Sequence, residues 1–153
     1  TGKIISINIS KNKGERKKPV IGAWKLVEGC GLMDDGHANP DPHAQGENSH
    51  RQVSLLAEES IEKMRQAGLD VVPGDFAENI TTNGISLLSL KIGDRLHVGD
   101  KVLLRISQIG KVCHNRCAIY YQAGDCVMPK EGIFAEVIKG GLIEVGDEVD
   151  TVL

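Results

Sequence analysis

Short segments in which apolar residues occupy every second position recur along this chain, and turn-forming dipeptides separate them. Residues 102–107 and 133–137 follow this pattern, and residues 3–9 do so with Ile5, Ile7 and Ile9 on one face. Gly-Asp dipeptides, which are typical of turns, begin at residues 74, 93, 99, 124 and 146. Short strands joined by recurring turns favour a mainly β fold that closes, fully or partly, into a barrel.

Length and composition describe one ordinary globular domain. The chain has 153 residues, within the range of a single core, and we expect one domain spanning residues 1–153. Hydrophobic residues make up 41% and charged residues 25%, so the chain can bury a core. The net charge of −3 and the 3% of aromatic residues argue against a nucleic-acid binder, which needs a basic face or a stacking surface.

Nothing in the sequence indicates a membrane protein or a secreted one. No apolar run approaches the roughly 18 residues of a membrane span, and the first residues lack the apolar region of a signal peptide. We therefore expect a cytoplasmic protein. Its four cysteines are too few for a disulfide scaffold, and the cytoplasm would keep them reduced. The cysteines are therefore candidates for a chemical role rather than for disulfide bonds.

Between the strands, the pattern predicts one helix and two loops. Residues 57–67 are rich in helix formers, with Ile61 and Met64 on one face, and Gly68 stands where a glycine ends a helix. Residues 10–19 are mostly Lys, Arg, Asn and Gly, so we expect an exposed loop whose charge faces solvent. Residues 29–46 lack periodicity, and so long a loop is uncommon unless it is functional.

The densest group of reactive side chains lies at residues 111–117, after the strongest predicted strand. A thiolate is the reactive form of cysteine, and Lys111, His114 and Arg116 would favour it if they point at a sulfur atom. Cys113 or Cys117 would then be a nucleophile or a metal ligand. An alternative of equal weight is that both cysteines are small buried hydrophobic residues at a strand end.

Zinc binding is a less favoured alternative for the same region. Its ligands would be Cys113, His114, Cys117 and Cys126. Structural zinc sites usually use two compact pairs of ligands, and the second pair is missing here unless a loop histidine joins Cys126.

Two further groups of polar residues are candidate sites. His37 and Arg51, in residues 34–51, suit acid–base chemistry and the binding of a phosphate or carboxylate. Residues 73–84 gather Glu78, Asn79 and Thr81 between glycines that allow close backbone approach. This segment fits a polar pocket, and it fits equally a capped turn that enters a strand.

Several ordered motifs resemble the MOSC family, domains similar to the C-terminal part of molybdenum cofactor sulfurases. They are Asp35-x-His37, RQVSL at residues 51–55, PGDFAENITTNGI at 73–85, IGDRLHVG at 92–99 and a cysteine just past the next strand. The resemblance spans roughly residues 2–149, and the block with Glu78 and Asn79 is its most specific part.

The resemblance implies a single-domain MOSC-type β-barrel with a few short helices. It implies that Cys113 takes up sulfur from a cysteine desulfurase, with pyridoxal phosphate only in that partner, and that Lys111 stabilises the thiolate. Cys117 or Cys126 would be a second, resolving thiol. Other partners would be molybdenum cofactor enzymes or biosynthesis proteins. The residues expected to bind the anionic cofactor are His37, Arg51, Glu78, Asn79, Thr81 and Arg116.

Departures from the family pattern leave other functions open. Val112 precedes Cys113 where many members have proline, and Asp34 stands where a glycine is common. In related members the cysteine binds molybdenum, so Cys113 is also the candidate metal ligand of an oxidoreductase that reduces N-hydroxylated compounds. Such an enzyme would need separate electron donors, because this chain has no flavin, haem or iron–sulfur motif. A third alternative is a non-catalytic module that delivers the cofactor.

Overall fold

The computed structural model describes residues 2–10, 17–33, 35, 52–68, 70–76, 78–109 and 132–152. Its strands in the first half are Gly2–Ile9 (β1), Lys18–Pro19 (β2), Trp24–Val27 (β3), Gly31–Leu32 (β4), Val53–Ala57 (β5) and Ile80–Asn83 (β6). The second half holds Arg95–Val98 (β7), Val102–Ile109 (β8), Ile133–Lys139 (β9), Gly141–Ile143 (β10) and Glu148–Val152 (β11). An α-helix spans Glu58–Gln66 (α1), and a 3-10 turn spans Leu87–Ser89.

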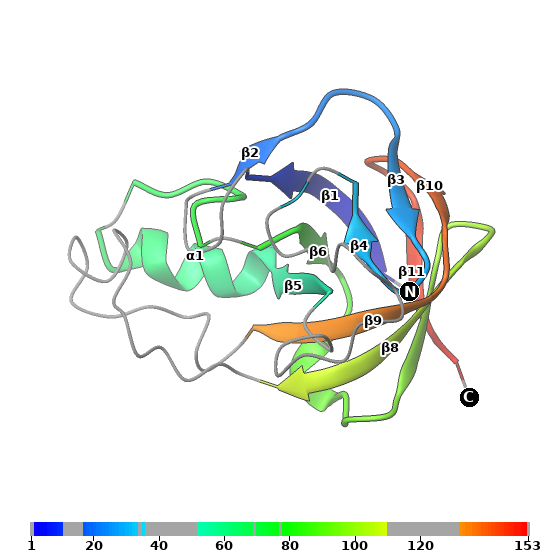
Figure 1. Ribbon diagram of the computed structural model, residues 1–153. Coiled ribbons are helices and arrows are strands. Elements are labelled where there is room, and N and C mark those ends of the chain that lie inside the picture. Colours follow the sequence, from blue (N-terminus) through cyan, green and yellow to red (C-terminus); the bar gives the residue numbers. More distant parts are fainter. Residues whose placement is uncertain are drawn as a thin grey trace.

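Seven strands form a closed barrel, which confirms the predicted fold class (Figure 1). They pair in the order β11-β7-β8-β9-β5-β6-β1, and β11 also pairs with β1, so that the sheet closes on itself. Among the described strands, only β5 and β6 pair in parallel, with α1 in the connection between them. β2 extends the sheet beyond the C-terminal end of β1.

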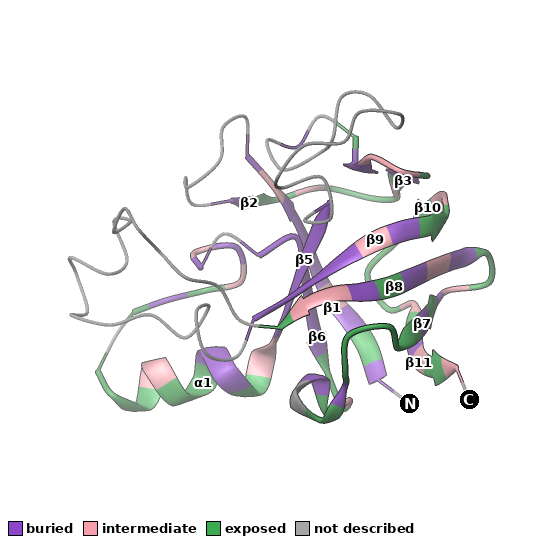
Figure 2. Cartoon of the chain, turned by 60° about the horizontal axis from the view of Figure 1, so that its bottom comes forward, coloured by how far each residue is buried: buried purple, intermediate pink, exposed green. Residues whose placement is uncertain are grey.

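Alternation along the strands fills the barrel with aliphatic side chains, as predicted (Figure 2). In β8, Val102, Leu104 and Ile106 are buried, and Arg105 between them is exposed. The small sheet β10-β3-β4 contributes Leu26 and Leu32 to the same core. One core therefore joins the barrel and this second sheet.

The prediction that Ile5, Ile7 and Ile9 form the apolar face of β1 is wrong in part. Ile7 is fully buried, but the second isoleucine in the core is Ile4, and Ile5 and Ile9 are half-buried. A register irregularity against β6 lies between Ile4 and Ser6. Such a bulge shifts the alternation of a strand by one residue. Polar side chains after the bulge are thereby turned into the protein.

Helix α1 packs on the outside of the barrel. Ile61 is fully buried in a small cluster with Leu56 of β5 and Phe134 of β9, and Met64 packs against it. Gly68, at a φ of 100°, follows the last turn and donates its N–H to the carbonyl of Arg65. The predicted helix, its apolar face and its glycine stop are confirmed.

The prediction of an exposed loop over residues 10–19 is wrong in part, since Lys18 and Pro19 are exposed but the other described residues are buried. Ser10 and Lys17 are buried, and Lys18 and Pro19 form β2. Lys17 is buried because a carboxylate inside the protein neutralises its charge, as described below.

No helix in the described ranges is long and apolar enough to span a membrane.

Candidate functional site

A network of buried polar residues connects β1, β5 and β6 with the turn that precedes β6. Its members are Ser6, Asn8, Ser54, Glu78, Asn79 and Thr81. Buried polar groups are costly unless they are hydrogen-bonded. The network therefore shows which groups the fold holds in fixed positions.

Glu78 fixes the turn that enters β6. Its side chain is fully buried, and its Oε1 accepts a hydrogen bond from the backbone N–H of Gly74 at 2.9 Å. Its Oε2 accepts from the hydroxyl of Thr81, also at 2.9 Å. The carboxyl group thus ties the start of the turn to the strand that follows it.

Asn8 is the centre of the network, and the sequence analysis did not single it out. Its Nδ2 donates to the carbonyl of Glu78 and to Oγ1 of Thr81, both at 3.2 Å. Its Oδ1 accepts from the hydroxyl of Ser6 at 2.6 Å. Asn8 therefore links the C-terminal end of β1 to Glu78 and Thr81.

Asn79 connects β1 to β5. Its Oδ1 accepts hydrogen bonds from the backbone N–H and hydroxyl of Ser54, at 3.0 and 3.2 Å. Its Nδ2 donates to the carbonyl of Asn8 at 3.1 Å. The side chain thus continues the sheet hydrogen bonding at the start of β6.

The Asn79–Ser54 bonds lie next to the end of β8 and the start of β9. These two strands flank residues 110–131 in the sequence, here called the cysteine segment. The last residue of β8, Ile109, pairs with Ile133, the first residue of β9, and Ile133 pairs in turn with Leu55. Ser54 is the neighbour of Leu55, so the Asn79–Ser54 bonds lie one residue along the strand from this pairing. Residues 110–131, which include Cys113, lie between these two strand ends in the sequence.

Two more buried contacts anchor residues next to the predicted site segments. Oδ1 of Asp35, two residues before His37, accepts from Nζ of Lys17 at 2.7 Å and from the backbone N–H of Ser10 at 3.0 Å. Gln52 directly follows Arg51 in the sequence, and its Oε1 accepts from the backbone N–H of Val137 at 2.9 Å. These hydrogen bonds fix the two described residues that flank residues 36–51 in the sequence.

Most of the predicted site residues lie outside the described residues. These are His37, Arg51, Lys111, Cys113, Arg116 and Cys117, together with the alternative zinc ligands His114 and Cys126. Glu78, Asn79 and Thr81 are described, and the structure brings them together. Their side-chain polar atoms form hydrogen bonds inside the protein, to one another and to neighbouring residues of the network.

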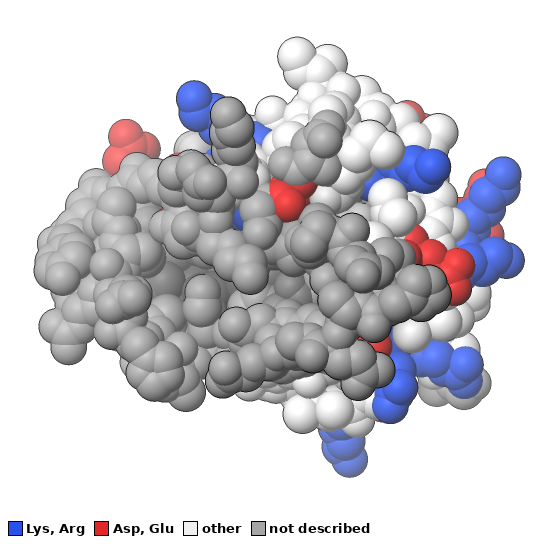
Figure 3. Space-filling view, viewed as in Figure 1, with Lys and Arg blue, Asp and Glu red and all other residues white. Residues whose placement is uncertain are grey.

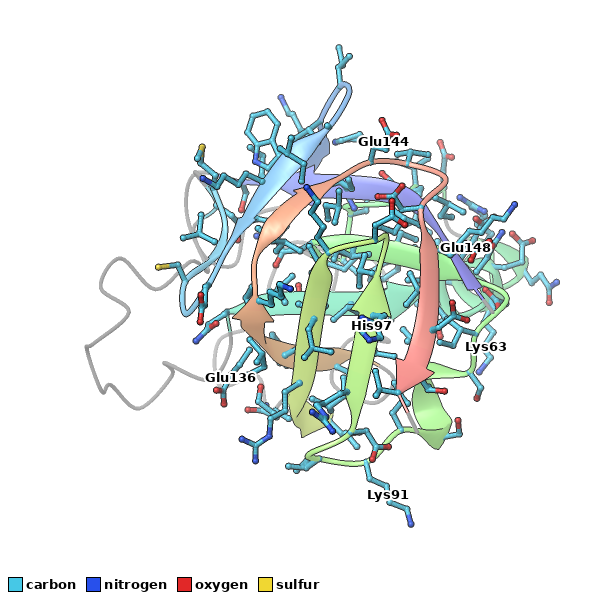
Figure 4. The ribbon with its side chains drawn as sticks, turned by 90° about the vertical axis from the view of Figure 1, so that its right-hand side faces the viewer. Lys63, Lys91, His97, Glu136, Glu144 and Glu148 are labelled. Carbon is cyan, nitrogen blue, oxygen red and sulfur yellow. The ribbon has the colours of Figure 1, made fainter. Side chains whose placement is uncertain are left out.

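Two cavities bounded by described residues have acidic linings. One of about 680 Å³ is lined by Lys101 and by the carboxylates of Asp100, Glu144, Asp147, Glu148 and Asp150. Glu144 and Glu148 lie on the same side of the barrel (Figure 4). Another cavity, of about 510 Å³, is lined by Glu58, Glu59 and Glu62. Carboxylates repel a phosphate-bearing pterin, so these two cavities do not fit the molybdenum cofactor.

Neither a patch of like charges in Figure 3 nor a group of metal-binding side chains defines a further site in the described part of the chain. Acidic and basic side chains are interspersed over the coloured part of the face in Figure 3. Among the described residues, no group of three or more His, Cys, Asp or Glu side chains could hold a metal ion.

Burial raises the pKa of Glu78 from 4.5 to about 7. Transfer of a carboxylate out of water favours its neutral form. Hydrogen bonds from the Gly74 N–H, the Thr81 hydroxyl and nearby backbone groups favour the charged form and oppose this shift only in part. Glu78 therefore changes its charge near neutral pH.

We expect stability to fall with rising pH because of Glu78. Below pH 4.5 both states are protonated; between pH 4.5 and about 7 the unfolded chain ionises first, so the folded state binds more protons. This costs about 3 kcal/mol of unfolding free energy by pH 7. Urea unfolding from pH 4 to 8 should show that slope in the parent and lose it in Glu78→Gln. The same slope in both proteins would contradict the assignment.

Adjacent threonines of β6 should respond oppositely to replacement by valine. Thr82 is fully buried, and its hydroxyl has no hydrogen-bond partner, so Thr82→Val should raise the unfolding free energy by about 1–2 kcal/mol. Thr81→Val should lower it by about 1–3 kcal/mol, because groups of Glu78 and Asn8 lose their partner. Denaturant unfolding compares them, and equal effects would show that the network does not stabilise the fold.

The closed barrel with its buried polar turn defines a class of small, mainly β domains. Comparison of sequences then identifies the family, because the family model described as the MOSC domain matches residues 35–150. The chain belongs to the MOSC domain family. No functionally curated protein matches it.

Solved structures share the fold at low sequence identity. The YuaD protein from Bacillus subtilis is similar with a TM-score of 0.75 and 18% identity, over 97% of this chain and 94% of that chain. YiiM from Geobacillus stearothermophilus has a TM-score of 0.70 and 21% identity, over 100% and 76%. YiiM from Escherichia coli has a TM-score of 0.64 and 22% identity, over 99% and 70%.

Proposed function

We propose that this MOSC domain is a cytoplasmic sulfur carrier in molybdenum cofactor metabolism, with Cys113 as the sulfur-accepting residue. Membership of the family carries the proposal, because the matched residues 35–150 include the whole cysteine segment. The buried network supports it, since Asn79 and Ser54 are fixed beside the strand ends that flank that segment in the sequence.

The chemical step is a transfer of sulfane sulfur. The Cys113 thiolate attacks the terminal sulfur of a persulfide on a cysteine desulfurase, and the S–S bond of that persulfide breaks. A new S–S bond forms on Cys113, and the desulfurase cysteine leaves as a thiolate. No external oxidant is needed, because one persulfide replaces another.

Each remaining predicted residue has a defined role in this proposal. Lys111 and Arg116 stabilise the Cys113 thiolate and persulfide by their positive charge. Cys117, or alternatively Cys126, is a resolving thiol. Its thiolate attacks the sulfur atom of Cys113 in the persulfide, so that a disulfide with Cys113 forms and sulfide leaves, and a thiol reductant then restores both cysteines. His37 and Arg51 line the surface that receives the partner or the cofactor, which is the cargo of the carrier. Pyridoxal phosphate belongs to the desulfurase.

Mass spectrometry after sulfur loading tests the proposal. The purified protein is incubated with a cysteine desulfurase and cysteine, and its peptides are searched for one added sulfur atom. We expect that atom on Cys113. If no cysteine gains sulfur and elemental analysis finds bound molybdenum, the chain is instead a cofactor-binding oxidoreductase component. If cofactor binds and survives alkylation of the cysteines, it is a delivery module.

A further inference from the structure

The buried ion pair between Lys17 and Asp35 has no role in the proposal above. Both side chains have 0% exposure, and Nζ of Lys17 also donates to the hydroxyl of Ser10 at 3.1 Å. Oδ1 of Asp35 receives donors from two segments, the ammonium of Lys17 and the backbone N–H of Ser10. Asp35 is therefore fixed against both the end of β1 and the start of β2.

Stability alone is a weak reason for such a pair. Two buried charges lose their hydration, and well-packed apolar residues of similar size are often as stabilising or more so. The ion pair instead fixes the relative position of its two side chains, because a charged hydrogen bond holds its partners at one distance and angle. A contact of this kind fits a need for fixed geometry.

The backbone of Lys17 contacts the turn that Glu78 holds. Its N–H donates to the carbonyl of Gly74 at 2.7 Å, and its own carbonyl oxygen lies against the α-carbon of Gly74. The N–H of Gly74 is bound by Oε1 of Glu78. Lys17 thus contacts both the Glu78 network, through its main chain, and Asp35, through its side chain.

We infer that Lys17 is a positioning residue that holds Asp35 in a fixed place relative to the Gly74–Thr81 turn. The inference rests on the proposed function in that the property it serves is sulfur loading. It also has a structural consequence of its own, because Lys17 should keep the hydrogen bonds of Gly74 intact. That consequence can be measured whether or not the protein carries sulfur.

The double variant Lys17→Met/Asp35→Leu separates positioning from stability. It replaces the pair by apolar side chains, so its midpoint of urea unfolding should equal or exceed that of the parent. We expect its initial rate of sulfur loading to fall at least about tenfold, since small misplacements have large effects on rates. Hydrogen exchange of the amides at residues 17 and 74 should become faster.

Thr82→Val is the matched control. It also removes a buried polar group from the described core, but that hydroxyl has no partner and joins no segments. Its loading rate and its exchange at residues 17 and 74 should equal those of the parent. If the double variant does not fold, Asp35→Asn replaces it, because it keeps Oδ1 and removes the charge. The same losses are expected at a temperature where circular dichroism shows that variant folded.

Each outcome decides the inference. Parent-like exchange and loading in the double variant would overturn it. Faster exchange with slower loading supports it. If the parent protein itself gains no sulfur, the proposed function fails, and hydrogen exchange alone then decides the role of Lys17.

Discussion

Cys113→Ser should abolish sulfur loading. A serine hydroxyl cannot form a persulfide, and at neutral pH it is not ionised as a thiol can be. After incubation with a cysteine desulfurase and cysteine, the variant should show only the background of added sulfur by mass spectrometry. Its unfolding midpoint should stay close to that of the parent, because the substitution exchanges two small side chains.

The other cysteines provide the controls for this result. Cys30 lies half-buried in the turn after β3, and Cys30→Ser should load sulfur at the parent rate. Cys117→Ser should still gain sulfur on Cys113 but release it as sulfide more slowly, because no disulfide with Cys117 can form. Normal loading of Cys113→Ser, with the sulfur on Cys117 or Cys126, would move the acceptor role to that residue.

Gly74→Ala should be among the most destabilising single substitutions in the described chain. Gly74 has a φ of 96°, which costs other residues about 1–2 kcal/mol. A β-carbon would also lie well inside 3.0 Å of the Lys17 carbonyl oxygen, a backbone atom that cannot turn away. Such overlap adds about 1–3 kcal/mol. Urea unfolding should therefore show a total loss of about 2–5 kcal/mol.

Gly93→Ala is the control that isolates the contact with Lys17. Gly93 has a φ of 97°, almost the same as Gly74, but a β-carbon there meets nothing within 4 Å. It should lose only the backbone cost of about 1–2 kcal/mol. Equal losses in the two variants would mean that the turn at Gly74 moves away from Lys17 at no cost.

Periodicity in the sequence predicts the strands and the helix because burial on one face requires it. The alternation of Val102, Leu104 and Ile106 and the helical spacing of Ile61 and Met64 are confirmed. It misplaces the buried face of β1, because a bulge adds one residue and no pattern of apolar residues records it. The pairing that closes the barrel, between residues at opposite ends of the chain, also has no local signal.

The polar network was predicted only in part, for a related reason. Glu78, Asn79 and Thr81 lie close together in the sequence, so a search for dense polar segments finds them. Asn8 joins them from about 70 positions away. Lys17 is one of several cations in residues 10–19. The position of Asp35 in the fold is what distinguishes it from Lys18, which is exposed. The burial of a charge is decided by its partner, and partners distant in sequence leave no local pattern.

The pairing of β11 with both β1 and β7 has a consequence for synthesis on the ribosome. β1 is synthesised long before its partner, because Gly2 and Lys3 pair with Val149 and Glu148. Until those residues emerge, both β1 and β7 have an open edge, and unpaired edges are the part of a β protein most exposed to wrong association. The barrel can therefore close only after β11 has been synthesised, and the pairing of β11 with β1 and β7 is the step that closes it.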